Sequence, residues 1–184
     1  SGAVLDSGNP AGNLCLNCHQ GRASTNSVNG RIASAGVGDD EVSDALGFIN
    51  VHYFAAGASL FGDEAQGAYQ YDGQDYIGRF EHVPNFQTCT DCHSAHELEV
   101  KVEACGACHQ GVESAEDLHN IRLDPTDWDG DGDTDEGIAG DIDTMGEALY
   151  AAMQAYAADV IGTAIVYDSH SYPYFFTDTN EDGM

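Results

Sequence analysis

Cysteine in this 184-residue chain occurs only in three short motifs. The six cysteines form three pairs with the spacing C-x-x-C, and a histidine follows the second cysteine of every pair. These residues are Cys15, Cys18, His19, Cys89, Cys92, His93, Cys105, Cys108 and His109. C-x-x-C-H is the attachment signature of c-type haem. Two thiols at this spacing can add to the two vinyl groups of one porphyrin, and the next imidazole can reach its iron. The sequence therefore predicts three covalently bound c-type haems.

Three other uses of paired cysteines explain less of the pattern. Zinc sites also use C-x-x-C pairs, but they need no histidine directly after the second cysteine. A redox-active C-x-x-C is usually single and lies at the start of a helix. A disulfide framework would leave three adjacent histidines unexplained. Haem attachment accounts for every cysteine and for three of the eight histidines.

Five histidines lie outside the motifs, and they are candidates for the second axial position of the irons. They are His52, His82, His96, His119 and His170. Histidine is the commonest haem ligand, and three irons need three distal histidines to be bis-histidine. We predict distal ligands among the first four of these histidines and leave the role of the fifth open. With three haems, at least two of the five must serve elsewhere, for example on an iron of another subunit.

The spacing of the motifs predicts which haems are neighbours. The second and third motifs start 16 residues apart, whereas the first and second start 74 apart. His96 follows His93 by three residues, so both side chains leave one helical turn in the same direction. They cannot ligate opposite faces of one iron, which makes His96 a candidate ligand of a different haem. We therefore expect the second and third haems to lie close together.

The motifs, the distal histidines and three further phrases carry a resemblance to a known family. The phrases are LCLNCHQGR at 14–22, NVHY at 50–53 and YPYFF at 172–176. With them the chain resembles multihaem c-type cytochromes of the bacterial or archaeal extracytoplasmic kind. The looser match covers most of the chain and is not specific to one activity. The resemblance implies export before haem attachment, hence a periplasmic, cell-surface or extracellular location, and we read the chain as mature. It also implies electron exchange with other cytochromes, with copies of the chain in a filament, or with extracellular metal oxides.

The charge of the chain excludes several kinds of partner. Lys and Arg number 5 against 32 Asp and Glu, which gives a formal net charge of −27. Such a surface repels phosphate backbones and anionic lipids, so nucleic-acid binding is not expected. The longest apolar stretch, around 160–167, is interrupted by Gly162 and Thr163. It is far shorter than the roughly 20 residues of a membrane span, so no such span is predicted.

Carboxylates alternate along residues 127–136 in a pattern typical of calcium loops. The pattern D-x-[DN]-x-[DN]-G is matched by three aspartates and Gly132. The predicted Ca²⁺ ligands are Asp127, Asp129, Asp131, Asp133 and Asp135. The twelfth position is Ile138 rather than Glu, so a full EF-hand is not predicted, and Glu136 or Asp141 could supply the missing carboxylate. The same pattern begins again at 178–183 but is cut off at Met184. We therefore expect the natural chain to extend beyond this residue.

The elements that must position these residues are few. Apolar periodicity predicts helices over 40–56, 115–123 and 144–167. Met145, Leu149 and Met153 are expected to form the buried stripe of the last helix, since axial ligation by methionine is the less favoured alternative. Residues 1–13 and 20–40 are expected to be loops, and 66–80 a hairpin or an irregular loop. The predicted fold is mainly α plus coil, an irregular, loop-rich multihaem cytochrome c fold with little or no sheet. We expect a single trihaem domain over 1–184, incomplete at its C-terminus.

Electron transfer is the function that these features predict. Three irons each closed by two histidines have no open position for a substrate, so no catalytic residue is predicted. The alternative is a reductase or oxidase of a small inorganic substrate. It needs one open iron beside an acid–base or cationic group, and only five Lys and Arg are available. A redox-inactive docking subunit is a third interpretation.

Overall fold

The computed structural model describes residues 2–52 and 54–179. The chain divides into two compact units, Ser1–Lys101 and Val102–Met184, and each is described by itself. Helix and coil dominate both units, and the sheet found in the described residues has two strands. The predicted fold class is thus confirmed, whereas a single trihaem domain stays a prediction. In the described part of the chain, no helix combines the length and the apolar character needed to cross a bilayer.

The first helix, α1, spans Pro10–His19 and carries the first cysteine motif. The side chain of Asn9 caps it by accepting a hydrogen bond from the amide of Ala11, 2.8 Å away. Proline at the first helical position fits because its missing N–H would have no partner within the helix. The expected loop over 1–13 is therefore wrong at its end, since the helix includes the last four residues of that range, 10–13.

The second helix, α2, spans Thr25–Ala35, where a loop was expected over 20–40. A capping box at Ser24 and Ser27 starts it, and Gly36, with a left-handed φ of 67°, ends it. These start and stop signals outweigh the polar composition that suggested a loop.

The helix predicted over 40–56 does not form. The described residues between 41 and 55 are turns and irregular backbone. Gly47 lowers helix propensity in the middle of this segment. The Asn50 side chain accepts a hydrogen bond from the His52 amide at 2.7 Å, a local turn that competes with a helix. His52 itself has a φ of 82°, outside the helical region.

A small apolar core holds unit 1 together. Helix α3, Ala56–Phe61, is followed by the short 3₁₀-helix η1, Gly62–Glu64. Leu16 of α1 packs with Ala58, Phe61 and Ala65 in this core. A Cβ atom on Gly57 would lie 2.6 Å from Leu16 Cδ2, so glycine at 57 permits the close approach of α1 and α3. The segment over 66–80 is the irregular loop of the two predicted alternatives.

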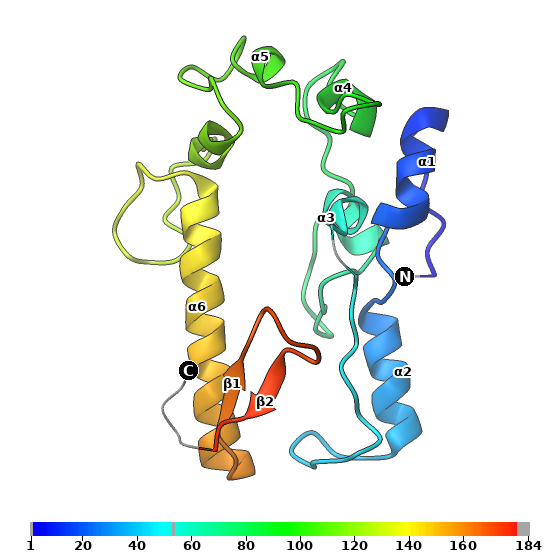
Figure 1. The fold of residues 1–184 in the computed structure, drawn as a ribbon, viewed down its shortest axis with the longest axis vertical. Coiled ribbons are helices and arrows are strands. Elements are labelled where there is room, and N and C mark those ends of the chain that lie inside the picture. The colour runs from blue at the N-terminus through cyan, green and yellow to red at the C-terminus, as the bar shows by residue number, and fades with distance from the viewer. Residues whose placement is uncertain (1, 53, 180–184) are drawn as a thin grey trace. The chain divides into compact units, whose positions relative to one another are not determined.

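Unit 2 is built around one long helix, α6, Ile138–Tyr156 (Figure 1). The π-helical turn η3, Ala157–Ile161, continues it, and Gly162 follows with a φ of 76°. Strand β1, Ile165–Tyr167, pairs antiparallel with β2, Phe175–Thr177. This hairpin is fixed to α6 by the Tyr150 hydroxyl, which accepts from the Tyr167 amide at 2.9 Å. The helix predicted over 144–167 therefore exists, but it begins earlier and gives way to a turn and a strand.

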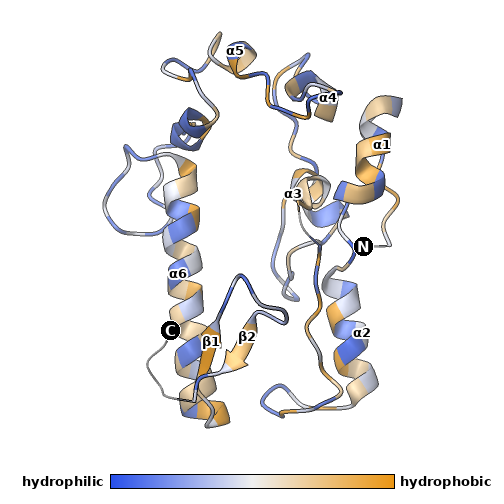
Figure 2. Cartoon of the chain, in the orientation of Figure 1, coloured by the Kyte–Doolittle hydropathy of each residue, from blue (hydrophilic) through white to orange (hydrophobic). Residues whose placement is uncertain are grey.

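The predicted burial of the α6 apolar stripe is wrong. Met145 is 42% exposed, Leu149 63% and Met153 37%. Figure 2 shows hydrophobic colour recurring along α6, in contrast to the hydrophilic loop before it. The helix that was predicted over 115–123 is a five-residue 3₁₀-helix, η2, Glu116–Asn120. The apolar period of α6 predicts its helical structure correctly, but the residues described supply no protein core to cover it.

Candidate haem-attachment sites

The first motif occupies the last turn of α1. Cys15 is half-buried, Cys18 is exposed, and His19 ends the helix. Leu16 lies between the two cysteines and is buried in the core of unit 1. Burial of Leu16 fixes the rotation of α1 and thereby the direction of both thiols. The motif is thus presented on a rigid element rather than on a loop.

A backbone carbonyl orients the imidazole of His19. Nδ1 of His19 lies 2.6 Å from the carbonyl oxygen of Phe54. A carbonyl oxygen can only accept, so Nδ1 must carry the proton. In the neutral ring Nε2 is then the atom with a lone pair for a metal. This is how a metal-binding histidine is usually held.

The second motif forms the short helix α4, Cys89–Cys92. Thr88 and Asp91 form a capping box at its start. The Asp91 carboxylate accepts hydrogen bonds from the amides of Thr88 at 2.8 Å and Gln87 at 3.0 Å. These hydrogen bonds hold the pKa of Asp91 below its ordinary value. The caps offset the low intrinsic stability of so short a helix.

His93 is held by the loop that follows it. Its Nδ1 lies 3.2 Å from the carbonyl oxygen of Leu98. The loop turns back because Leu98 has a φ of 63° and its amide donates to the carbonyl of Ser94 at 2.9 Å. His93 and Val100 form an isolated antiparallel bridge. Two motifs therefore share one arrangement, in which Nδ1 of the motif histidine faces a backbone carbonyl.

The first two motifs lie side by side in unit 1. Helices α1 and α4 contact each other, and Cys89 Sγ lies 3.9 Å from the carbonyl oxygen of Gly12. Burial raises the pKa of the Cys89 thiol, and the neighbouring Cys15 thiol raises it further. Motifs that start 74 residues apart are thus brought together, which the spacing argument did not foresee. The third motif belongs to the other unit, so proximity of the second and third haems stays a prediction.

The third motif begins in helix α5, Val102–Cys105, and continues as a turn. The His109 amide donates to the Cys105 carbonyl at 2.9 Å, which keeps both cysteines and the histidine on one compact turn. A cavity of about 390 Å³ lies beside it. The cavity is lined by Cys108, His109, Gln110, Gly111, Val112, Asp117, Asn120, Ile121 and Arg122. The 3₁₀-helix η2 therefore faces the motif across this cavity.

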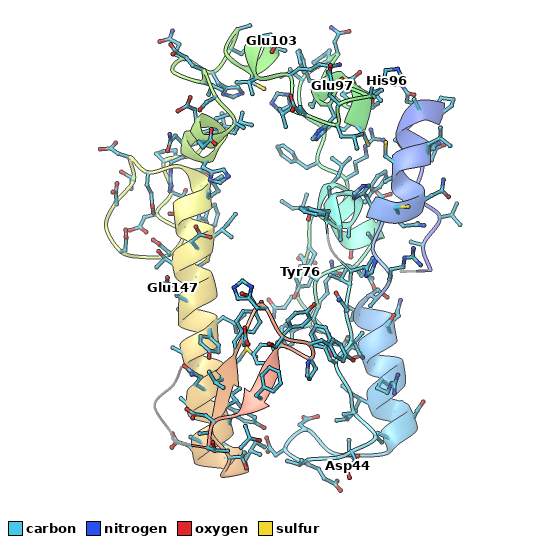
Figure 3. All side chains as sticks on the ribbon, in the orientation of Figure 1. Asp44, Tyr76, His96, Glu97, Glu103 and Glu147 are labelled. Carbon is cyan, nitrogen blue, oxygen red and sulfur yellow. The ribbon has the colours of Figure 1, made fainter. Side chains whose placement is uncertain are left out.

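Three of the five candidate distal histidines, His52, His96 and His119, lie on segments next to the motifs. His52 precedes by two residues the carbonyl that holds His19. His96 lies on the loop between His93 and Leu98, and Figure 3 labels it close to α4. His119 is on η2, the 3₁₀-helix that lines the cavity beside the third motif. His82 is exposed in a loop with its ring 6.2 Å from that of Phe86, and His170 lies in the turn between β1 and β2.

The described residues fit the binding of c-type haem. All six cysteines carry thiols rather than disulfides. Nδ1 of His19 and of His93 faces a carbonyl, which leaves the opposite ring nitrogen for a metal. Large apolar side chains that a protein core would normally cover are exposed, and a porphyrin is an apolar body that can cover them. In the first two motifs a backbone carbonyl oxygen holds the imidazole in place, and no sequence motif indicates this contact.

The acidic loop before α6 is the other site that the sequence indicated. The structure gathers Asp127, Asp129 and Asp131 with Glu136 and Asp141. Burial raises the pKa of Glu136, and the adjacent carboxyl of Asp141 raises it further. In the described residues, the two remaining predicted ligands, Asp133 and Asp135, are not part of these groups. Arg122, which sequence reasoning did not select, forms an ion pair of 2.9 Å with Asp141.

Comparison with known proteins agrees with the haem motifs. The chain is 25% identical over 200 residues to the C-type polyheme cytochrome OmcB from each of two strains of Geobacter sulfurreducens. It is equally similar to the C-type polyheme cytochrome OmcC of that species. Each alignment covers 94% of this chain, and the chain spans 22% of the relative's length. No family model and no solved structure matches. The similarity and the three motifs together support a multihaem c-type cytochrome.

Proposed function

We propose that this chain transfers electrons through three covalently attached c-type haems. Cys15, Cys18, Cys89, Cys92, Cys105 and Cys108 would form the thioether links. The observation that carries the proposal is the repeated geometry of the first two motifs. In each, both cysteines and the histidine leave one helical turn, and a backbone carbonyl orients the imidazole. When bound, each haem supplies a one-electron ferric–ferrous couple.

The histidines of the chain would close each iron on both sides. His19, His93 and His109 are the proposed proximal ligands, and His52, His82, His96 and His119 are the proposed distal ligands. The carbonyl that orients His19 belongs to Phe54, and His52 is only two residues from it. The same holds for His96 beside His93. Both histidines are therefore better placed to serve a haem other than that of the motif they adjoin.

Close packing of the first two motifs supports rapid electron exchange within unit 1. The Cys15 thiol lies near enough to Cys89 to help raise the pKa of the Cys89 thiol. Haems linked to these two cysteines would be neighbours. The packing of α1 on α4 thus holds two attachment points at a fixed separation, which is what an electron relay requires.

Location and partners follow from the haem chemistry and the charge. We propose an extracytoplasmic location, because haem attachment of this kind follows export in the family that the chain resembles. A net charge of −27 favours basic redox partners. Other cytochromes, further copies of this chain and extracellular metal oxides are the proposed electron donors and acceptors.

Assembly into a filament is a further part of the proposal. Five histidines are available for three distal positions, and a surplus histidine donated to a neighbouring copy would join the two haem chains. Electron microscopy of the purified holoprotein tests this part alone. Filaments that dissociate on removal of a single surplus histidine support it, and a monodisperse monomer at all concentrations contradicts it.

Haem count and redox titration test the main proposal. Intact mass should exceed that of the polypeptide by three haems that survive denaturation, since thioether links are covalent. Spectroelectrochemical titration should then show reversible one-electron steps whose amplitudes sum to three irons. Loss of the cofactor on acid–acetone extraction would contradict covalent attachment. A catalytic current with a small inorganic substrate would favour the reductase or oxidase alternative.

A further inference from the structure

Two groups of carboxylates in unit 2 overlap at one aspartate. Oxygens of Asp127, Asp129 and Asp141 lie within 4.8 Å of one another, and so do oxygens of Asp129, Asp131 and Glu136. Asp129 belongs to both groups. The residues come from two elements, the loop over 127–136 and the first turn of α6. Five carboxylates are thus linked into one cluster through Asp129.

Several of these oxygens are buried without a partner. Asp141 is 0% exposed, and in the described part of the chain its Oδ1 has no hydrogen-bond partner. Its Oδ2 lies 2.9 Å from Nη2 of Arg122. Asp129 Oδ2 and Glu136 Oε1 are likewise buried and, among the described residues, accept no hydrogen bond. Burial of an unpaired carboxylate oxygen is costly, and one arginine balances only one of five charges.

The loop is folded so that these oxygens are available. Both oxygens of Asp127 accept amide hydrogen bonds, from Gly130 at 2.6 Å and Gly132 at 3.0 Å. The two glycines have φ values of 80° and 95°, which the tight turns require. Asp129 uses Oδ1 for the Asp131 amide at 3.2 Å and leaves Oδ2 facing its neighbours. The backbone thereby holds one oxygen of Asp129 and leaves its other oxygen without a hydrogen bond among the described residues.

We propose that this cluster binds one Ca²⁺ through Asp127, Asp129, Asp131, Glu136 and Asp141. Oxygens bound to one Ca²⁺ at 2.3–2.6 Å lie at most about 5 Å apart, and the separations in both groups fall within that limit. Mg²⁺ binds at shorter distances, demands octahedral geometry and usually keeps several waters. A crowded set of carboxylates in an irregular loop therefore suits Ca²⁺ better. Glu136 and Asp141 take the place of the bidentate Glu that a full EF-hand has and that Ile138 cannot supply.

The bound cation would also fix the segment that carries His119. Gly137 lies against this segment so closely that a Cβ atom there would overlap the carbonyl oxygen of His119. The Ile138 amide donates to the Ile121 carbonyl at 3.3 Å, and Arg122 Nη1 donates to the Glu136 carbonyl at 3.2 Å. Calcium would thus hold η2 against α6. The link to haem ligation rests on the proposed function, whereas the site itself does not.

Calorimetric titration of the chelator-treated holoprotein with CaCl₂ tests the site. We expect one Ca²⁺ per chain, with much weaker binding of MgCl₂. Asp131→Asn and Asp129→Asn should each weaken Ca²⁺ binding by about tenfold or more, because each removes a charged ligand. Asp135→Asn removes the same charge from the same loop outside both groups and is the matched control, with an expected change of less than about threefold.

Two results would overturn the proposal. One is the absence of calcium binding by the unaltered protein. The other is an equal weakening of Ca²⁺ binding by Asp135→Asn and Asp131→Asn. That result would show that the cation is attracted only by the overall negative charge of the loop. Circular dichroism checks that each variant folds. If Asp129→Asn does not fold, the test rests on Asp131→Asn, because the Asp131 side chain is exposed. Haem count and redox titration are measured on the same samples. If calcium does not bind but three haem couples are present, the calcium site is refuted and the proposed function is not. If calcium binds but three haem couples are not found, the proposed function is refuted and the calcium site is not.

Discussion

Nδ1 of His19 lies 2.6 Å from the carbonyl oxygen of Phe54, 35 residues further along the chain. The corresponding atom of His93 lies 3.2 Å from the carbonyl oxygen of Leu98, only five residues away. Both acceptor residues have left-handed backbone angles, with φ of 49° at Phe54 and 63° at Leu98. Two unrelated loops therefore provide the same contact, and both accept an unfavourable backbone conformation to do so.

The Leu98 carbonyl can be displaced without altering any ligand. Proline fixes φ near −65° and cannot adopt the angle of Leu98, so Leu98→Pro should move the carbonyl away from His93. Asparagine tolerates the left-handed region, so Leu98→Asn is the control. Loss of this hydrogen bond removes about 1 kcal/mol and lowers the basicity of the imidazole. The reduction potential of one haem should rise by on the order of tens of millivolts.

Protein-film voltammetry of the three proteins measures this shift. We expect the unaltered protein and Leu98→Asn to agree within error, with a single couple displaced in Leu98→Pro. Identical potentials in all three would show that the contact does not influence the iron.

Adjacent haems in the first and second motifs should couple electronically. The α1–α4 contact places Cys15 beside Cys89, so we expect a split Soret signal in the circular dichroism spectrum. Replacement of Cys15 and Cys18 by alanine should remove most of that splitting. The equivalent replacement of Cys105 and Cys108 is the matched control and should retain a split signal. Splitting that is unchanged without the first haem would refute the predicted adjacency.

Gly57 should be intolerant of a side chain. A Cβ atom at 57 would lie 2.6 Å from Leu16 Cδ2 and 2.8 Å from the carbonyl oxygen of His19. We expect Gly57→Ala to lower the free energy of unfolding by about 1–3 kcal/mol. Gly30 lies in α2, where a Cβ atom would have no neighbouring atom within 4 Å, so Gly30→Ala should instead add about 0.5–1 kcal/mol. Thermal unfolding compares the two, and equal effects would contradict the close packing of α1 on α3.

Acid should loosen the segment before α1 through Asp6. Hydrogen bonds from Asn13 Nδ2 and the Gly8 amide lower the pKa of Asp6 below its ordinary value of 3.8. The folded pKa is depressed, so the stabilising contribution is fully present above pH 3.8 and is lost as the pH falls through the lower, folded pKa. Hydrogen exchange at Gly8 should therefore quicken only in that acid range. In Asp6→Asn this step should be absent, and a midpoint above 3.8 would reverse the predicted sign.

The sequence indicates candidate haem-binding residues more clearly than the elements that carry them. The three motifs and helix α6 were predictable because spacing and 3.6-residue periodicity are local properties. Helix α2 was missed although Ser24 and Gly36 are ordinary start and stop signals. A helix was wrongly predicted over 40–56 because the apolar spacing of this segment was given more weight than Gly47 and the turn at Asn50.

The rest could not be predicted because it depends on tertiary contacts. No pattern in the sequence indicates that the carbonyls of Phe54 and Leu98 face imidazoles. The closeness of the first motif to the second follows from the packing of α1 on α4. The stripe of α6 was predicted to be buried because apolar periodicity predicts a helix but does not show whether anything covers its apolar face.

Carbon monoxide binding tests the central claim most directly. The claim is that three irons are each closed by two histidines of the chain and serve electron transfer alone. The absorption spectrum of the dithionite-reduced protein should be unchanged by carbon monoxide, because CO needs an open axial position. A shift that involves about one haem's share of the Soret absorbance would contradict the account. It would reveal an open iron and bring the reductase or oxidase alternative forward.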